Sequence, residues 1–258
     1  MKKWTSKLLT LLYLAVFLYS GFVLVKYLYT YYEASKSLKE VQAIYETTLE
    51  TLGGESEVEA TVTEDLLSKY RIRPQFEDLQ AVNEHIVGWI SVDGTKLNNP
   101  ILQTDNNDFY LDHNFKDNYS RAGSIFMDYR NDVMDMNRNT ILYGHAMKNG
   151  TMFGNLKNYL QQDYADAHST IYVDTLYEGY DIEVFAAYET TIDFYYIETE
   201  FQTDETFLKF IEEVKERSAI QTDVEIGAAD KIITFSTCKD AVMRDDHRFV
   251  VQGKLVKR

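Results

Sequence analysis

The stretch Lys231-Ile-Ile-Thr-Phe-Ser-Thr-Cys238 joins an apolar, β-branched run to the only cysteine among 258 residues. Side chains alternate between the two faces of a strand, so Thr234, Ser236 and Cys238 would share one face. A row of small polar side chains ending in a thiol is unusual for a strand that faces a core, and it suits the floor of a cleft. The stretch therefore predicts a strand over 232–237 that ends at an accessible thiol.

Two other strand-like runs carry chemically active side chains at their ends. Ile141-Leu-Tyr-Gly-His145 ends at a histidine, and Arg248 opens the run 248–255 ten positions after the cysteine. A thiolate attacks acyl carbons well, an imidazole transfers protons near neutral pH, and a guanidinium can stabilise an oxyanion. Cys238, His145 and Arg248 are therefore the candidate catalytic residues.

Each of these residues also has an ordinary interpretation. Free cysteine is among the most buried residue types, so Cys238 could be an inert part of the core. His145 could be an exposed loop histidine, and Arg248 could pair with Asp245 or Asp246 at a strand edge. Sequence spacing does not rank the histidines by their distance from the thiol. The competing histidines are His85, His113, His168 and His247.

The charge of the chain is large, negative and unevenly distributed. A formal net charge of −15 argues against a nucleic-acid partner, because phosphate binding depends on clustered Lys and Arg. Residues 1–32 hold four lysines and no acidic residue, so subtracting their +4 from −15 leaves −19 on the remainder. A basic tip and an acidic body fit a membrane-anchored protein whose body stays soluble by self-repulsion.

The composition also limits metal and disulfide chemistry. One cysteine allows no intrachain disulfide and no multi-cysteine zinc site. Asp128, Asp132 and Asp135 lack the ligand spacing of a calcium loop. The sequence therefore predicts no metal site and no cofactor.

Residues 8–25 are uncharged and mostly apolar. At helical rise they span about 27 Å, close to the hydrocarbon thickness of a bilayer. The lysines before this run predict a cytoplasmic tip over 1–7, a transmembrane anchor over 8–29 that contacts the lipid bilayer, and an extracellular body. A cleaved signal peptide is the competing interpretation, but no small-x-small site follows the run directly.

The chain after the anchor predicts a stalk, a linker and one folded domain. Polar residues with apolar ones at helical spacing continue to about Leu52, and Gly53-Gly54 ends that pattern. An acidic linker follows, with a short helix at 64–70. We therefore expect a stalk and linker over 30–73 and the catalytic domain over 74–258.

The domain is predicted to be mainly β, with helical inserts. Short β-like runs separated by turn signals favour a closed barrel over a doubly wound sheet. Helices are expected at 74–84, 153–161 and 204–217, the last with Asp204 as its N-cap. The β-like runs are 87–92, 97–103, 108–111, 123–128, 140–144, 171–174, 181–188, 232–237 and 248–255.

From about Phe76 to Arg258 the chain resembles the sortases, and specifically class B. Thr234-Phe-Ser-Thr-Cys238 fits the TLxTC signature with Phe in place of Leu, and the run 248–255 resembles the family's RxVVxGKL-like ending. Tyr143-Gly-His-Ala-Met147 looks like the class B histidine segment, and the helix at 204–217 looks like the class B insertion. Further resemblances lie in 86–90, 110–115, 120–128 and 152–156.

This resemblance implies an eight-stranded barrel and a cysteine transpeptidase that uses the three candidate catalytic residues. Cys238 would attack the threonine carbonyl of a C-terminal sorting signal, NPxTN-like in class B, and form a thioacyl enzyme. An amine of a peptidoglycan precursor or of a pilin would resolve it. Arg248 would stabilise the oxyanion and Asp240 would orient the histidine, while Ser236 and Thr237 would line the substrate groove.

Two rival functions stay open at this stage. A cysteine protease would let water resolve the acyl-enzyme, and a catalytically silent tethered domain would only bind in the same groove. For an enzyme, a thiol and an imidazole that both titrate near neutrality predict a bell-shaped pH–rate profile. Lys239, beside the thiol, would favour the thiolate. The exact sorting motif, the acceptor and the oligomeric state do not follow from the sequence.

Overall fold

The computed structural model describes residues 2–52, 71–191, 193–237 and 247–258. It contains two compact units, 1–40 and 41–258. The first unit consists of the helix α1 (Lys2–Leu52) up to residue 40. Within the described part of the chain, α1 is the one helix that is long and apolar enough to cross a membrane. Large apolar side chains of its N-terminal part are exposed, as at Phe17, which is 72% accessible.

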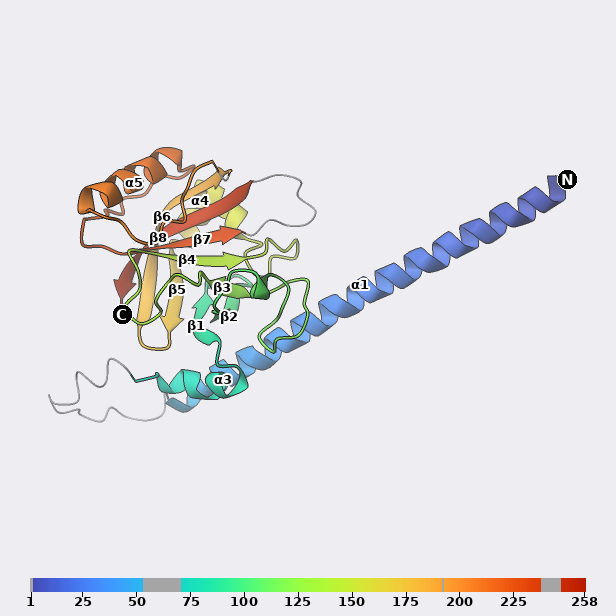
Figure 1. Cartoon of the computed structure of the whole chain (residues 1–258), viewed down its shortest axis with the longest axis horizontal. Helices are drawn as coiled ribbons and strands as arrows, with labels where there is room; N and C mark the ends of the chain where they lie inside the picture. Colours follow the sequence, from blue (N-terminus) through green and yellow to red (C-terminus); the bar gives the residue numbers. More distant parts are fainter. Residues whose placement is uncertain (1, 53–70, 192, 238–246) are drawn as a thin grey trace. The chain divides into compact units, whose positions relative to one another are not determined.

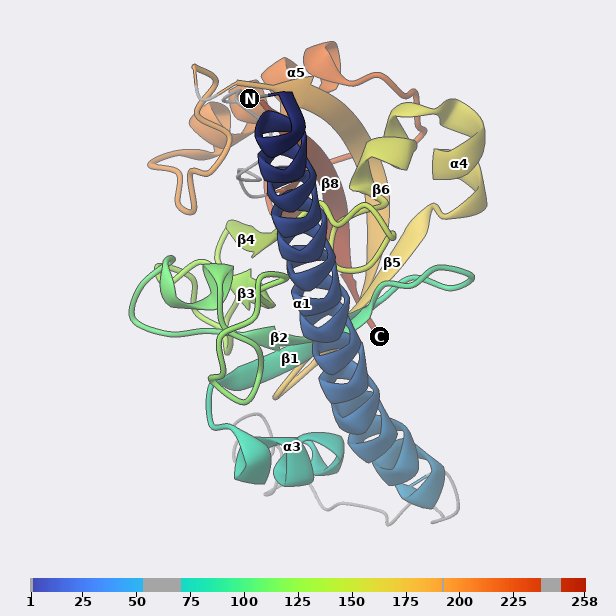
Figure 2. The same ribbon diagram turned by 90° about the vertical axis from the view of Figure 1, so that its right-hand side faces the viewer.

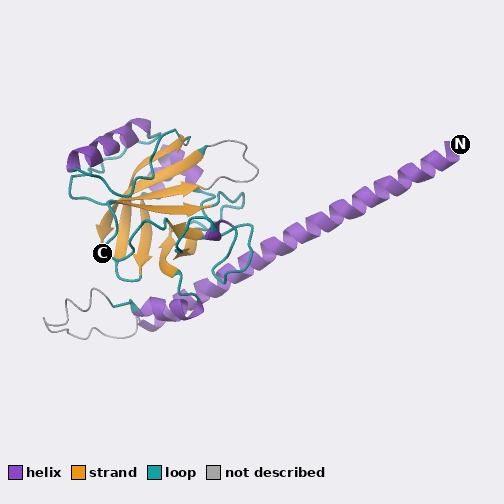
Figure 3. Ribbon diagram, viewed as in Figure 1, coloured by secondary structure: helices purple, strands orange, loops and turns teal. Residues whose placement is uncertain are grey.

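The second unit is a closed β-barrel, which Figure 3 shows in orange. The strand order around it is β1-β2-β3-β4-β7-β8-β6-β5, and β2–β3 and β4–β7 are its parallel pairs. The mainly β, closed eight-stranded barrel expected from the sequence is thus confirmed. The strands are β1 (Ile86–Ser91), β2 (Asn98–Leu102), β3 (Ile125–Met127), β4 (Asn139–Gly144), β5 (Thr170–Thr175), β6 (Gly179–Thr190), β7 (Ile232–Thr237) and β8 (Arg248–Lys257).

One expected strand is absent from this barrel. Residues 109–111 form the 3-10 helix η2 (Phe109–Leu111). The Asn106 side chain accepts hydrogen bonds from the backbone N–H groups of Asp108 and Phe109 at 2.9 and 3.0 Å. An Asn that bonds its own following backbone closes a turn and competes with strand pairing, so the prediction of a strand over 108–111 was wrong.

The helices lie close to their predicted positions. The expected 74–84 helix is η1 (Pro74–Phe76) followed by α3 (Glu77–Val82), and the 153–161 insert is η3 (Leu156–Leu160) with α4 (Gln162–Ala167) after it. The insert before β7 is α5 (Asp204–Arg217), which packs on β6 in both views (Figures 1 and 2). Its N-cap is Thr203 and not Asp204: Thr203 and Thr206 form a reciprocal capping box.

Strand β7 contributes to two apolar clusters. Ile233 and Phe235 belong to the cluster in the barrel interior, and Ile232 belongs to the cluster beneath α5. All six residues of β7 are buried. The strand therefore has no free face, because α5 and the segment before it cover the side turned away from the barrel interior.

The C-terminal part of α1, from Val41, belongs to the same compact unit as the barrel. Tyr45 stacks on Trp89 of β1 with ring centroids 4.2 Å apart, and its hydroxyl donates to Asp174 at 3.3 Å. Gln42 Nε2 donates to the Asn98 carbonyl at 2.7 Å. The compact unit therefore includes helix residues that the sequence assigned to the stalk. The helix expected at 64–70 lies outside the described residues.

Candidate active site

The edge of the barrel where β4 and β7 end carries the candidate site. The two strands are parallel and in register to their last residues, where Gly144 lies opposite Thr237 (Figure 1). His145 directly follows Gly144, and Cys238 directly follows Thr237 in the sequence. Cys238 and Asp240 themselves lie outside the described residues. The β4–β7 pairing therefore brings the residues next to the predicted thiol and imidazole to one edge.

His145 is held by a backbone carbonyl. Its Nε2 lies 2.7 Å from the carbonyl oxygen of Leu111. A carbonyl can only accept a hydrogen bond, so Nε2 carries a hydrogen and donates it. In the neutral imidazole Nδ1 is then the basic nitrogen, and it is the atom able to take up and return a proton.

The loop after β4 fixes the backbone of His145. Its carbonyl accepts hydrogen bonds from the N–H groups of Met147 and Phe153, each at 3.0 Å. A Cβ at Gly144 would lie 2.9 Å from the Phe153 ring, and a Cβ at Gly154 would overlap the Met147 carbonyl oxygen. Both glycines permit the close packing that holds the histidine loop against the barrel.

The Leu111 carbonyl is itself positioned by a second loop. Gly123 has φ +57°, and a Cβ there would lie 2.6 Å from the carbonyl oxygens of both Tyr110 and Leu111. The N–H of Ser124 donates to the Tyr110 carbonyl at 2.9 Å. A residue other than glycine at 123 would therefore push away the carbonyl that holds His145.

Arg248 begins β8, opposite Thr190 of β6. It is half-buried, and its Nη1 donates to the His247 carbonyl at 2.9 Å. The next residue, Phe249, donates its N–H to the Thr237 hydroxyl at 2.9 Å. The start of β8 is thus hydrogen bonded to the residue that precedes Cys238.

The polar side chains of β7 are buried and do not form an open cleft floor. Ser236 is 1% exposed, and its hydroxyl lies 2.8 Å from the Tyr196 hydroxyl. Thr234 donates to Asn139 Oδ1 at 2.7 Å and accepts from Gln252 Nε2 at 2.7 Å. This face of the strand is therefore a satisfied polar network beneath the segment before α5, a correction to the expected cleft.

The competing histidines have partners of their own. His85 Nδ1 lies 2.9 Å from the Tyr110 hydroxyl, and His168 Nδ1 lies 3.0 Å from the Tyr164 carbonyl. His113 Nδ1 lies 2.7 Å from an Asp112 carboxylate oxygen. His247, next to Arg248, lies 2.9 Å from Glu189. Among the described histidines, His145 is the one that directly follows the β4–β7 edge.

Sequence reasoning missed a buried, hydrogen-bonded carboxylate close to this edge. Asp128 is fully buried and accepts hydrogen bonds from Arg130 and from the Tyr143 hydroxyl. Burial alone would raise the pKa of Asp128, but the hydrogen bonds and the charge of Arg130 outweigh it and lower that pKa. Asp128 ends the predicted run 123–128, and an acid at a strand end followed two residues later by Arg was the available signal.

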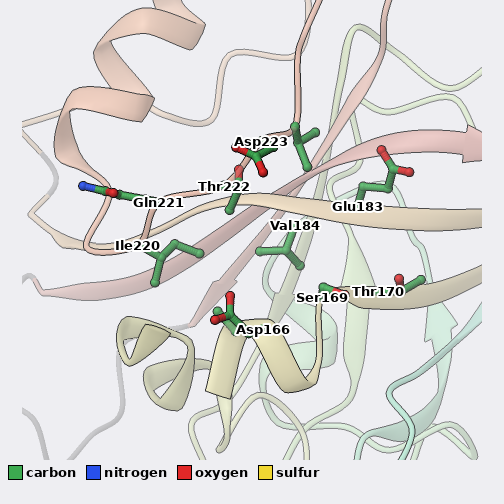
Figure 4. A pocket seen from close by; sticks show the side chains of 11 residues that line it. Asp166, Ser169, Thr170, Glu183, Val184, Ile220, Gln221, Thr222 and Asp223 are labelled. Atoms are coloured by element: carbon green, nitrogen blue, oxygen red, sulfur yellow. The ribbon is translucent and has the colours of Figure 1, made fainter. Parts of the chain in front are cut away.

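A cavity of about 350 Å³ lies elsewhere, between α4, β5, β6 and the chain leading to β7 (Figure 4). It is lined by Asp166, Glu183 and Asp223 together with hydroxyl and apolar side chains. Of the candidate catalytic residues, the two that the structure describes, His145 and Arg248, do not line it. Among the described residues, no group of three or more His, Cys, Asp or Glu side chains is arranged to hold a metal ion.

The chain and its barrel match a known family. A model of the sortase domain matches residues 90–256. The sortase B of Listeria monocytogenes is 40% identical over 257 residues, which cover 100% of this chain and 99% of that protein. The sortase B of Staphylococcus aureus is 44% identical over 194 residues, 74% of this chain and 80% of that protein.

Solved structures give the same result. A Bacillus anthracis protein described as similar to sortase B has 48% identity and a TM-score of 0.76, covering 88% of this chain and 98% of its own. A Staphylococcus aureus sortase B–substrate complex has 38% identity and a TM-score of 0.77, covering 86% and 96%. The chain belongs to the sortase family of cysteine transpeptidases. Within that family its relatives are sortase B proteins, which confirms the class B resemblance.

Proposed function

We propose that this chain is a membrane-anchored transpeptidase that cleaves an NPxTN-like sorting signal after threonine and transfers the protein to an amine. The observation that carries the proposal is the parallel end of β4 and β7. Gly144 lies opposite Thr237, and His145 and Cys238 are the next residues along the two chains. Successive Cα atoms are about 3.8 Å apart, so the pairing of Gly144 with Thr237 supports a joint action of the two residues that follow them.

In the first half-reaction the Cys238 thiolate attacks the threonine carbonyl carbon and forms a C–S bond. The C–N bond to the next residue of the signal then breaks, and the leaving amine takes a proton from the His145 imidazolium. Negative charge develops on the carbonyl oxygen, where Arg248 and a backbone N–H stabilise it. The hydrogen bond between Phe249 and Thr237, which ties the start of β8 to the end of β7, supports this role for Arg248.

In the second half-reaction an acceptor amine gives a proton to His145 and attacks the thioester. The C–S bond breaks, a new amide forms, and the thiolate is released. The hydrogen bond from His145 Nε2 to the Leu111 carbonyl supports a single proton-transferring nitrogen, Nδ1, in both steps. The acceptor is an amine of a peptidoglycan precursor or of a pilin.

The remaining predicted site residues have supporting roles in this proposal. Asp240 orients the histidine, and Thr237 lines the groove. A role for Ser236 in substrate binding would require its hydroxyl to exchange the hydrogen bond with Tyr196 for one with the peptide.

The membrane anchor of the proposal is residues 8–29, with the N-terminus in the cytoplasm and the catalytic domain outside the cell. It is supported by the long apolar first helix and by the lysines that precede the apolar run. Deletion of residues 1–29 should move the protein from the membrane fraction to the soluble fraction. Recovery of the truncated chain in the membrane would contradict the anchor.

The function is tested on the full chain in detergent. A panel of peptides bearing NPxTN and related signals is incubated with and without a triglycine acceptor, and products are identified by mass spectrometry. The proposal expects cleavage after threonine, a ligated product that requires the amine, and neither product with Cys238→Ala.

The same assay separates the rivals. Cleavage without ligation at any amine concentration would indicate a protease. Binding of the peptides with no cleavage, and no trapping of Cys238 by a substrate-like electrophile, would indicate a tethered binding domain.

A further inference from the structure

A fully buried carboxylate lies close to the strand that carries the histidine. Asp128, at 0% exposure, accepts from Arg130 Nε and Nη2, each at 2.8 Å. It also accepts from the Tyr143 hydroxyl at 2.9 Å and from Asn107 Nδ2 at 3.0 Å. Tyr143 is in β4, two residues before His145. The bidentate ion pair is therefore attached to the end of the histidine strand.

Arg130 uses its remaining donors on a different part of the chain. Its Nη1 donates to the Tyr195 hydroxyl and its Nη2 to the Ile197 carbonyl, both at 3.0 Å. Asn139 Nδ2 reaches the carbonyls of the two residues flanking Ile197. Residues 195–200 form neither helix nor strand. The side chains of Arg130 and Asn139 therefore supply hydrogen bonds that backbone carbonyls here would otherwise receive from a neighbouring strand.

Within this irregular stretch, residues 194–198 also contact the cysteine strand, β7. The Tyr196 hydroxyl lies 2.8 Å from the hydroxyl of Ser236, two residues before Cys238. Tyr195, next to Tyr196, presents its ring to solvent at 55% exposure. The segment thus bridges β4 and β7 beside their common end and offers an exposed aromatic side chain there.

We propose that Arg130 is a positioning residue for substrate binding, because it holds the segment 194–198 as one wall of the groove that receives the sorting-signal peptide. The proposal rests on the proposed function, since it assigns this wall to the same groove. Arg130 does not touch the reacting atoms. Its loss should therefore weaken peptide binding while the thiol and the histidine keep their chemistry.

Lysine cannot replace arginine here. A lysine ammonium is a point charge, whereas the guanidinium fork spans Asp128, Tyr195 and Ile197 at once. Arg130→Lys keeps the charge beside the buried carboxylate and so protects the fold. It loses the hydrogen bonds to Tyr195 and Ile197 that hold the segment. This variant therefore separates positioning from charge.

The test is the steady-state cleavage of an Asn-Pro-Gln-Thr-Asn peptide by the full chain in detergent. Arg130→Lys is expected to raise KM about tenfold, with kcat within about threefold of wild type, because one to two charge-assisted hydrogen bonds to the wall are lost. Tyr195→Phe, which removes only one of them, should raise KM by about two- to threefold. Iodoacetamide alkylation of Cys238 should proceed at the wild-type rate in both variants.

The matched control is Arg138→Lys, which changes an arginine of similar exposure, 21% against 28% for Arg130, in an ion pair with Asp204 on α5. Its KM should equal that of wild type. An unchanged KM in Arg130→Lys, or an equal fall of kcat and of the alkylation rate, would overturn the positioning role. If Arg130→Lys does not fold, the KM of Tyr195→Phe decides the matter in the same way. A wild-type chain that does not cleave the peptide would refute the proposed function, and with it this inference.

Discussion

The two described catalytic candidates are held in very different ways. His145 is fixed at its ring by the Leu111 carbonyl and at its backbone by Met147 and Phe153. The Arg248 guanidinium, within the described part of the chain, hydrogen-bonds to the carbonyl of its own neighbour, His247. The histidine is therefore preorganised, whereas the arginine can turn toward a substrate oxygen without breaking a tertiary contact that the structure describes.

This difference matches the chemistry that each residue would perform. A proton-transfer residue must keep one nitrogen aimed at the reacting atoms through both half-reactions, so a locked ring and a fixed tautomer help it. An oxyanion donor is needed only when charge develops, and its fork can engage the substrate at that moment. The comparison predicts that small changes in the surrounding structure will lower activity more when they move His145 than when they move Arg248.

The largest expected effect is at the histidine itself. His145→Ala removes the proton-transferring group, so kcat/KM for the peptide should fall by about 10²- to 10⁴-fold. Iodoacetamide should still alkylate Cys238 in the folded variant, which serves as the control. Cleavage within tenfold of wild type would mean that another residue, with His247 the first to test, performs the proton transfer.

Arg248→Lys should have the next largest effect. Replacing a planar fork by a point charge at the oxyanion should lower kcat by about 10²-fold while KM changes little. A rise in KM with an unchanged kcat would indicate that Arg248 binds the ground-state peptide instead. Arg73→Lys, in an ion pair with Asp174 away from the β4–β7 edge, is the matched control and should leave kcat unchanged.

A single methyl group tests the locked position of the histidine. Gly123→Ala forces a Cβ against the carbonyls of Tyr110 and Leu111, so kcat should fall by about tenfold as the His145 acceptor shifts. Gly94→Ala is the control, because Gly94 has a similar φ of +71° but open space around it. Both variants should lose about 1 kcal/mol from backbone strain. Gly123→Ala should lose further stability from the clash with the two carbonyls, and only this variant should lose activity. Equal kcat values in the two variants would contradict the proposed hold on His145.

The sequence predicted the strands well because their signal is local. The run 232–237 and the opening of β8 at Arg248 are β-branched or aromatic stretches, and the structure contains strands at these positions. The errors were local too. Asn106 closes a turn where a strand was expected, and Thr203 caps α5 in place of Asp204.

The partners of the site residues could not be predicted from spacing. The Leu111 carbonyl reaches His145 only after two loops fold together, and nothing in residues 109–111 marks that carbonyl as an acceptor. Arg130 and Ile197 are likewise far apart in the sequence, as are Tyr45 and Trp89. A histidine at a strand end can be recognised in one sequence, but the contacts that make it a rigid base depend on the closed barrel.

The smallest expected effect is on the stability of the fold at acidic pH, through the buried Asp128–Arg130 ion pair beside β4. The pKa of Asp128 is lowered in the folded protein, although burial opposes this, because Arg130 and Tyr143 stabilise the carboxylate. A carboxyl with a lowered folded pKa stabilises the fold above its unfolded pKa of about 4, and that contribution is lost as the pH falls through the folded value. The free energy of unfolding of wild type should therefore decrease as the pH falls below about 4, more steeply than that of Asp128→Asn.

Urea unfolding of residues 41–258 between pH 3 and 7 measures this difference. At neutral pH Asp128→Asn should be less stable by about 2 kcal/mol, because Arg130 loses its charged acceptor. Tyr143→Phe keeps the carboxylate but removes one donor, so its acid slope should lie between the other two. If all three chains show the same slope, the buried ion pair is not what links the histidine strand to the wall at 194–198. The rigidity of His145 would then depend on the Leu111 carbonyl at its ring and on Met147 and Phe153 at its backbone.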